Sequence, residues 1–265
     1  MSMDTGLAGA KALVTGGGSG IGRAIALALA REGADVVIAG RRPRPEVVAE
    51  LRDLGVHAEG LEVDVSREDA VVRMVADAAA HLGGLDRYVN VAAGAWHEPL
   101  THLTTHAWER TLATNLSGCV WGCREAARRF RDAGGGAILV IGSTATVSAQ
   151  PRETAYRASK AALKAHVEVA AVELAPFGIR VNLLTPGATD TAFVPPASAA
   201  QRERAMREVP LRREAQPDEL APAALLLLSD RLGGYITGAD LIVDGGLRLR
   251  PIFHGTDDDL RALSE

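Results

Sequence analysis

Residues 12–24 read ALVTGGGSGIGRA, an apolar run followed by a glycine-rich turn and the start of a helical pattern. The apolar run predicts a buried strand, and IGRAIALALAREG predicts a helix that ends at Gly33. Glycines between a strand and a helix let the main chain turn sharply and approach a ligand closely. The helix amino terminus adds free amide groups and a positive dipole, which suit a pyrophosphate. The stretch therefore predicts a dinucleotide site, with a merely tight turn as the alternative.

The spacing inside this turn does not match the common G-x-G-x-x-G fingerprint in any register. It matches T-G-x-x-x-G-I-G instead. A glycine-rich turn alone is a weak signal, and its position between a strand and a helix is what favours dinucleotide binding. The candidate cofactor contacts in the turn are Thr15, Gly16, Gly18, Ser19, Gly20, Ile21 and Gly22.

Apolar runs alternate with helical patterns along the rest of the chain. Continuous apolar strands separated by helices indicate a parallel sheet that is covered on both faces. We therefore expect an α/β fold, a single doubly wound Rossmann domain with a mostly parallel seven-stranded sheet and helices on both faces. Further strands are expected at 35–40, 61–65, 85–93, 137–143, 179–187 and 240–246, and helices at about 43–54, 66–81 (with Ser66 as N-cap and Asp69 in a capping box), 105–131, 156–175 and 199–207.

Composition and charge exclude several classes of protein. The chain has 265 residues, of which 47% are hydrophobic, and this is ample for a large core. Its net charge of −4 and scattered basic residues do not indicate nucleic-acid binding. No apolar run approaches the roughly 20 residues of a membrane span, and the first residues show no secretion signal. We expect a cytoplasmic protein.

No metal is expected. Cys119 and Cys123 lie four residues apart in one predicted helix, a spacing poorly suited to a disulfide, and two thiols do not complete a zinc site. They are interpreted as reduced, packed thiols. His97, His102 and His106 invite a metal site, but their loop setting argues against it.

The end of the second strand bears on the choice between NADP(H) and NAD(H). An NAD-preferring site usually has an acidic residue there, whereas this strand ends in Gly40, Arg41 and Arg42. Guanidinium groups match a 2′-phosphate bidentately, and cations at a helix amino terminus do not stabilise the helix. NADP(H) is therefore predicted over NAD(H), with a solvated basic loop as the alternative.

The stretch AYRASKAA places Tyr156 and Lys160 four residues apart, on one face of a helix. A cation close to a phenol favours the phenolate and lowers its pKa, which makes the phenol a usable proton donor and acceptor. A surface helix that happens to carry both residues is the alternative.

With the glycine-rich turn and this Tyr-x-x-x-Lys pair, residues 7–247 resemble the classical short-chain dehydrogenase/reductase family. Ser143 stands thirteen residues before Tyr156, as the family pattern expects, and Asn115 in ATNLSG matches its helical asparagine. RVNLLTPGATDTAF is similar to the segment that closes around the nicotinamide, and YITGADLIVDGG to the family's last strand. The nicotinamide segment contributes Pro186, Gly187, Thr189 and Thr191.

The resemblance implies a role for each matched side chain. Ser143 would hydrogen-bond the substrate carbonyl, and Tyr156 would exchange a proton with the alkoxide or alcohol. Lys160 would lower the pKa of Tyr156 and hold the nicotinamide ribose, and Asn115 would retain a water that links Lys160 to solvent. A solvent-exposed or locally bonded amide is the alternative for Asn115.

Four further positions match the family's adenine and main-chain contacts. Asp64 and Val65 would lie at the adenine, with a helix-terminal charge as the alternative for Asp64. The chain reads Asn90-Val91-Ala92-Ala93 where the family usually has Asn-Asn-Ala-Gly. Main-chain contact of Asn90 and Ala92 with the cofactor is therefore expected, without the usual detailed geometry.

Substrate contacts are expected beyond the carboxyl ends of the strands. The candidates are Trp96, His97, Gln150 and Phe193. Residues 189–213, which include Pro195 and Pro196, are long enough for a substrate lid. An aromatic wall would suit a hydrophobic or cyclic ketone.

The resulting hypothesis is an NADP(H)-dependent ketoreductase or secondary-alcohol dehydrogenase, similar to the 3-oxoacyl-carrier-protein reductases. A cofactor-binding scaffold or sensor with little turnover is the alternative, and enoyl reduction or isomerisation stays open. The resemblance implies a homotetramer that packs through the Cys119 and Tyr156 helices. Residues 1–247 would form the domain, and residues 248–265 a C-terminal extension that either crosses a neighbouring subunit or frays.

Overall fold

A parallel sheet organises the molecule, seen here in a computed structural model that describes residues 4–42, 44–193 and 198–249. The strand order is β3-β2-β1-β4-β5-β6-β7, and every neighbouring pair is parallel. The predicted doubly wound sheet is confirmed. Its strands are β1 (Lys11–Thr15), β2 (Asp35–Gly40), β3 (Ala58–Glu62), β4 (Arg87–Asn90), β5 (Gly136–Ile141), β6 (Ile179–Pro186) and β7 (Asp240–Val243).

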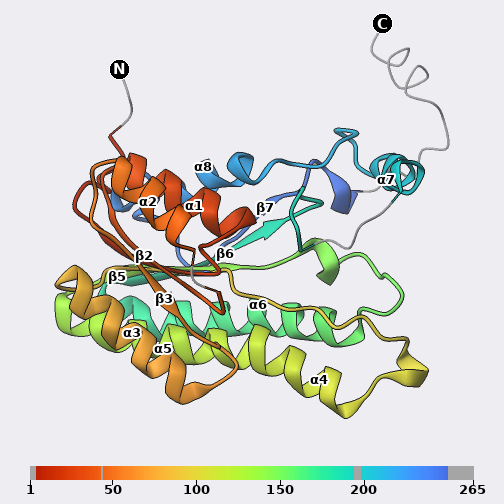
Figure 1. Cartoon of the computed structure of the whole chain (residues 1–265), viewed down its shortest axis with the longest axis horizontal. Helices are drawn as coiled ribbons and strands as arrows, with labels where there is room; N and C mark the ends of the chain where they lie inside the picture. Colours follow the sequence, from red (N-terminus) through yellow and green to blue (C-terminus); the bar gives the residue numbers. More distant parts are fainter. Residues whose placement is uncertain (1–3, 43, 194–197, 250–265) are drawn as a thin grey trace, which may run out of the picture.

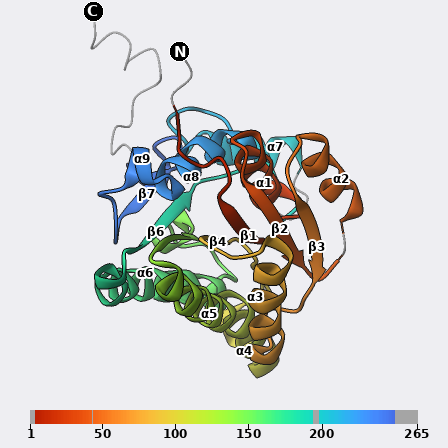
Figure 2. The same ribbon diagram turned by 90° about the vertical axis from the view of Figure 1, so that its left-hand side faces the viewer.

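Helices cover both faces of the sheet (Figure 1). One face carries α1 (Gly20–Arg31), α2 (Pro45–Asp53) and α8 (Ala221–Leu228). The other carries α3 (Glu68–Leu82), α5 (Gly118–Ala133) and α6 (Thr154–Leu174), which lie side by side below the strands in Figure 2. The remaining helices are α4 (Thr105–Leu112), α7 (Ala199–Met206), α9 (Asp230–Gly233), a π-helix (Ala113–Ser117) and 3₁₀ turns at Leu100–His102, Thr144–Thr146, Ala175–Phe177, Pro217–Leu220 and Leu247–Leu249.

Each face of the sheet has its own apolar core. Tyr88, Phe130 and Leu163 are fully buried between the strands and the α3, α5 and α6 face. Ile25 and Leu139 belong to the core on the opposite face. Burial of apolar side chains on both faces explains why the strands read as continuous apolar runs. Among the described residues, no helix combines the length and apolar character needed to cross a membrane.

The third strand lies earlier than predicted. The sequence favours 61–65, but β3 runs from Ala58 to Glu62, because it pairs with β2 only as far as Gly40. The predicted cap of the next helix is also wrong. The Ser66 hydroxyl donates to Asp64 Oδ1 at 2.7 Å, and α3 starts one residue later than that cap requires, with Arg67 at its N-cap.

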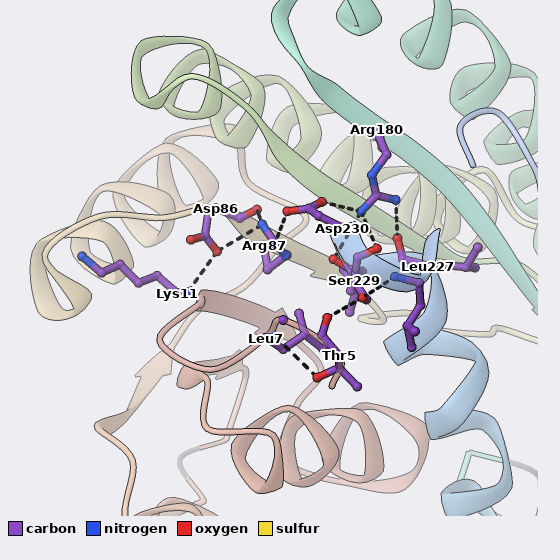
Figure 3. Close-up of polar contacts among 12 residues, drawn as sticks. Thr5, Leu7, Lys11, Asp86, Arg87, Arg180, Leu227, Ser229 and Asp230 are labelled. Carbon is purple, nitrogen blue, oxygen red and sulfur yellow. Dashed lines mark hydrogen bonds and ion pairs between the residues drawn. The ribbon is translucent and has the colours of Figure 1, made fainter. Parts of the chain in front are cut away.

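An ion network joins strands at the amino ends of the sheet, opposite the edge where a ligand is expected (Figure 3). Arg87 at the start of β4 and Arg180 in β6 are both buried and share the carboxylate of Asp230, at 2.7 and 2.9 Å. Arg180 also donates to the main-chain carbonyls of Leu227, Leu228 and Ser229. Burial tends to raise the pKa of Asp230, but the hydrogen bond from Arg180 and both guanidinium charges lower it overall.

We expect Asp230→Asn to lower the free energy of unfolding by about 2 kcal/mol near neutral pH, because two buried guanidinium groups lose a charged acceptor. The lowered pKa of Asp230 sets the sign of the pH dependence. The stability that the Asp230 carboxylate adds to the folded state is fully present above its unfolded-state pKa. It is lost as pH falls through the folded-state pKa of Asp230. Urea unfolding at neutral and acidic pH measures the difference, with the exposed Asp132→Asn as control. Equal stability of both variants at neutral pH would contradict this role for Asp230.

Candidate active site

The glycine-rich turn at the end of β1 has no room for side chains. Gly16 has φ +69°, and a Cβ there would lie 3.0 Å from the Ala92 nitrogen. A Cβ on Gly22 would lie 2.3 Å from the Gly16 carbonyl oxygen. Gly20 has φ +50°, and its Cβ position is 3.1 Å from Thr191 Cγ2, so the predicted nicotinamide segment reaches the turn. The glycines thus let the turn pack closely on itself, on the loop after β4 and on the segment after β6.

The amino terminus of α1 opens onto the same turn. Ser19 is its N-cap, but its side chain makes no capping hydrogen bond, and the first helical turn contains no acidic residue. Free amide groups and an uncompensated positive dipole favour an anion there. The glycine-rich turn and this helix end fit the pyrophosphate of a dinucleotide.

A hydrogen-bonded group links the turn to the altered motif after β4. Thr15 Oγ1 accepts from the main-chain nitrogens of Val91 and Ala92, at 3.1 and 3.2 Å. Asn90 Oδ1 accepts from Thr15 Oγ1 at 3.4 Å and from the Tyr88 hydroxyl at 3.3 Å. The segment is therefore held in place without the family's usual second asparagine.

The basic end of β2 lies open to solvent. Arg41 and Arg42 are exposed beside Gly40, and the Arg41 charge lies near the carboxylate of Asp64. Burial tends to raise the pKa of Asp64, but hydrogen bonds from Ser66 and the charges of Arg110 and Arg41 lower it overall. Asp64 is therefore ionised next to a candidate phosphate-binding arginine.

Sequence analysis missed Arg44. A Cβ on Gly18 would lie 2.4 Å from Arg44 Cγ, so this side chain covers the glycine-rich turn. Its guanidinium also pairs with Glu46 at 3.4 Å. Residues 41–44 read RRPR, so the sequence shows a third arginine close to Arg41 and Arg42. Only the packing of β2 against the turn shows which arginine covers Gly18. Val65, the other predicted adenine contact, is buried.

Ser143 and Tyr156 lie together at the carboxyl edge of the sheet. Ser143 follows β5, and its hydroxyl accepts from the Ala145 nitrogen at 3.1 Å. Burial raises the pKa of Tyr156 above its ordinary value, and the Glu153 charge adds to this rise. A hydrogen bond with Ser143 acts in the opposite direction. Tyr156 is thus a neutral phenol at physiological pH.

The expectation that Lys160 lowers the pKa of Tyr156 is wrong for this arrangement. Lys160 Nζ donates to the Ile141 carbonyl at 2.7 Å and lies 5.9 Å from the centroid of the Tyr156 ring. It is not among the groups that shift the pKa of this phenol. Burial lowers the pKa of Lys160 itself to about 8.

Asn115 makes neither a local bond nor a solvent contact. It is buried in the π-helix between α4 and α5, where the sequence predicts one continuous helix. Its Oδ1 accepts from the Gly94 nitrogen at 2.7 Å, and its Nδ2 donates to the Gly94 carbonyl and to Ser159 Oγ. The π-helix therefore turns Asn115 toward the loop after β4 and toward α6.

The four predicted substrate contacts lie in different surroundings. The Phe193 ring is 5.9 Å from that of Tyr156, with 42° between their planes. Trp96 stacks under the Arg110 guanidinium at 5.3 Å. The His97 charge lies near Glu153, whereas Gln150 is exposed.

Glu153 is a residue near Tyr156 that sequence analysis missed. It lies at the N-cap of α6, and its Oε2 is buried without a hydrogen-bond partner in the described part of the chain. Burial raises its pKa, against the charges of His97 and Arg157. An acid with a raised pKa three residues before Tyr156 has no recognisable sequence pattern.

The segment after β6 returns to the body of the fold. Pro186 ends β6, and Gly187 packs so closely on Asp244 that a Cβ would lie 2.7 Å from its Cα. Thr189 is buried and bridges to Ala215. The short helix predicted at 199–207 is confirmed as α7. Pro195, Pro196 and residues 250–265 of the predicted extension lie outside the described residues.

Comparisons with known proteins agree with this geometry. A family model described as enoyl-(acyl carrier protein) reductase matches residues 16–248. L-rhamnose 1-dehydrogenase (NAD(P)(+)) of Azotobacter vinelandii is 36% identical, over 89% of this chain and 95% of the relative. D-threitol dehydrogenase of Mycolicibacterium smegmatis is 39% identical, over 94% and 97%. The crystal structure of a short-chain type dehydrogenase/reductase from Mycobacterium marinum superposes with a TM-score of 0.85 at 33% identity, covering 91% of this chain and 96% of that one.

Proposed function

Because this chain belongs to the short-chain dehydrogenase/reductase family of NAD(P)-dependent oxidoreductases, we propose that it is an NADP(H)-dependent ketoreductase that interconverts a ketone and a secondary alcohol. One observation carries the proposal. The Ser143 hydroxyl lies close enough to the Tyr156 phenol to oppose the rise of its pKa, and the pair stands at the carboxyl edge of the sheet, where the glycine-rich turn fits a dinucleotide. A scaffold that only bound the cofactor would not need this pair.

The chain's residues perform the proton chemistry, while a bound nicotinamide supplies or accepts the hydride. Ser143 orients the carbonyl oxygen and stabilises the charge that develops on it. Tyr156, a neutral phenol, donates its proton to that oxygen during reduction and accepts it during oxidation. Lys160, whose Nζ lies 5.9 Å from the centroid of the Tyr156 ring, would hold the nicotinamide ribose. Asn115 positions α6 and the loop at Gly94.

The cofactor preference follows from charge at the end of β2. The adenine-ribose end of NADP(H) would meet Arg41 and Arg42, with Asp64 and Val65 on the adenine side. Arg44 would cover the pyrophosphate from above Gly18. Pro186, Gly187, Thr189 and Thr191 would lie along the nicotinamide.

The substrate is a cyclic or hydrophobic ketone or alcohol. Phe193 supplies an aromatic surface next to Tyr156, and Trp96 a second one. His97 and Glu153 add polar groups suited to a hydroxyl remote from the reacting carbon. The relatives include dehydrogenases of L-rhamnose, D-threitol and cis-4-hydroxycyclohexanecarboxylate.

A nicotinamide absorbance assay tests the reaction class. Purified protein with NADPH or NADH is offered cyclic ketones, aromatic ketones, a 3-oxoacyl thioester and an enoyl thioester. Turnover of a ketone, faster with NADPH, is the expected result. Turnover of the enoyl thioester alone would mean that the protein catalyses enoyl reduction and not carbonyl reduction. Tight NADPH binding with no turnover of any ketone would favour the sensor.

The pH dependence should differ between the two directions. Reduction needs the protonated phenol, which the raised pKa of Tyr156 preserves, and the Lys160 charge, which is lost as pH rises through about 8. We expect kcat/KM for reduction to be level below pH 8 and to fall above it. Oxidation needs the phenolate, so it should rise with pH. Rates in both directions across neutral and alkaline pH test this, and a reduction rate that rises above pH 8 would contradict it.

Three further properties belong to this proposal. Residues 189–213 act as a lid, since Phe193 within them contacts Tyr156. The protein is a cytoplasmic homotetramer that packs through α5 and α6, where Val169 and Val172 on α6 are exposed. Residues 1–247 form the catalytic domain, followed by the extension. Light scattering on the purified protein tests the assembly.

A further inference from the structure

Two cysteines and a histidine meet between α5 and α6, on the face away from the glycine-rich turn. Cys119 and Cys123 are one turn apart on α5, free, and buried. His166 comes from α6, which lies beside α5 in both ribbon views. One sulfur from each cysteine and one ring nitrogen of His166 all lie within 4.8 Å of one another. Neither the proposed reaction nor the cofactor site uses these three groups.

The separations suit a tetrahedral metal ion. The two sulfurs are 3.9 Å apart. A zinc ion bound to both at its usual bond length would separate them by about 3.8 Å. Little movement of α5 is therefore needed, because residues four apart on a helix already share a face. One ring nitrogen of His166 lies within 4.8 Å of both sulfurs.

His166 has an unsatisfied nitrogen. Its Nε2 is buried without a hydrogen-bond partner among the described residues, and such atoms are rare unless they bind something. The side chain as a whole is only half-buried in the single chain.

We propose that Cys119, Cys123 and His166 form a binding site for one Zn²⁺ ion per chain, with a water molecule as the fourth ligand. Two thiolates neutralise a divalent cation, so the buried group carries no net charge. A monovalent thiophilic cation would leave one uncompensated negative charge in the same place. Thiolate and imidazole are ligands that zinc prefers.

Binding releases protons. Each thiol loses its proton to solvent as a sulfur–zinc bond forms, and no redox change takes place. Zinc affinity should therefore rise with pH. The sequence could not show the site, because His166 follows Cys123 by 43 residues on another helix.

The test is zinc stoichiometry on the full chain. Protein stripped with chelator under reducing conditions is dialysed against buffered Zn²⁺, and metal per chain is measured. Co²⁺ in place of zinc reports the ligands, since thiolate ligation gives an intense charge-transfer band. The variants are Cys123→Ala and His166→Gln, with the exposed His102→Gln as matched control. Circular dichroism confirms that each variant is folded.

The site predicts one zinc per chain in the wild type and in His102→Gln. Affinity should fall at least tenfold in both site variants, and the charge-transfer band should weaken in Cys123→Ala. If Cys123→Ala does not fold, the affinity of His166→Gln for zinc tests the proposal. This variant should fold, because the His166 side chain is only half-buried. Substoichiometric zinc in the wild type, or unchanged affinity in His166→Gln, would overturn the proposal. Neither result bears on the reductase, because NADPH turnover is measured without zinc.

Discussion

Tyr156→Phe is expected to lower kcat for ketone reduction by about 10²–10⁴-fold while leaving NADPH affinity close to that of the wild type. The substitution removes only the phenol hydroxyl, whose pKa Ser143 lowers. The ring that faces Phe193 at 5.9 Å is kept, so the cleft should keep its shape. Steady-state rates and an NADPH binding titration on the same preparation measure the two effects separately.

Tyr235→Phe is the matched control, because Tyr235 is fully exposed and lies far from Tyr156 in the sequence. It should keep the full rate. If Tyr156→Phe also kept the full rate, the proton would have to come from another group, and the role assigned to Tyr156 would be wrong. A parallel loss of NADPH binding would instead indicate a structural effect.

The double variant Arg41→Ala/Arg42→Ala is expected to weaken NADPH binding by about 10–100-fold and to leave NADH binding nearly unchanged. Each charge-assisted hydrogen bond to a phosphate contributes about 1.5–3 kcal/mol to binding. Because both arginines are exposed, we expect contributions at the lower end of that range. The effect should shrink at high salt, because exposed charges are screened. Binding titrations with both cofactors at two ionic strengths measure it.

Arg73→Ala is the control, since Arg73 is exposed on α3 and pairs with Asp69 there. It should leave both affinities unchanged. Equal weakening of NADPH and NADH binding by the double variant would mean that these arginines act on a shared part of the cofactor. Unchanged NADPH binding would leave Arg44 as the remaining candidate on this side of the turn.

Much of the fold could be predicted because its strands are buried on both faces and its turn residues are unusual. The position of β3 could not. Val63 and Val65 are apolar and buried, which is why the pattern favours a strand there. The strand ends at Glu62 because its partner β2 ends at Gly40, and register depends on the partner.

The site was predicted as a set of residues better than as a set of contacts. Spacing places Tyr156 and Lys160 on one face of a helix, but Lys160 Nζ bonds to a carbonyl of β5 that only the fold brings near. Asn115 likewise finds its partners 21 and 44 residues away. The pKa of Tyr156 depends mainly on burial, which helical spacing does not report.

Cofactor binding is the property on which every assigned role depends, and titration of the purified protein with NADPH and NADH measures it directly. The glycine-rich turn predicts one NADPH per chain, bound more tightly than NADH. Gly22→Val should abolish both, because its Cβ would meet the Gly16 carbonyl. Binding of neither cofactor by the folded wild-type protein would contradict the dinucleotide site, and with it the proposed reductase.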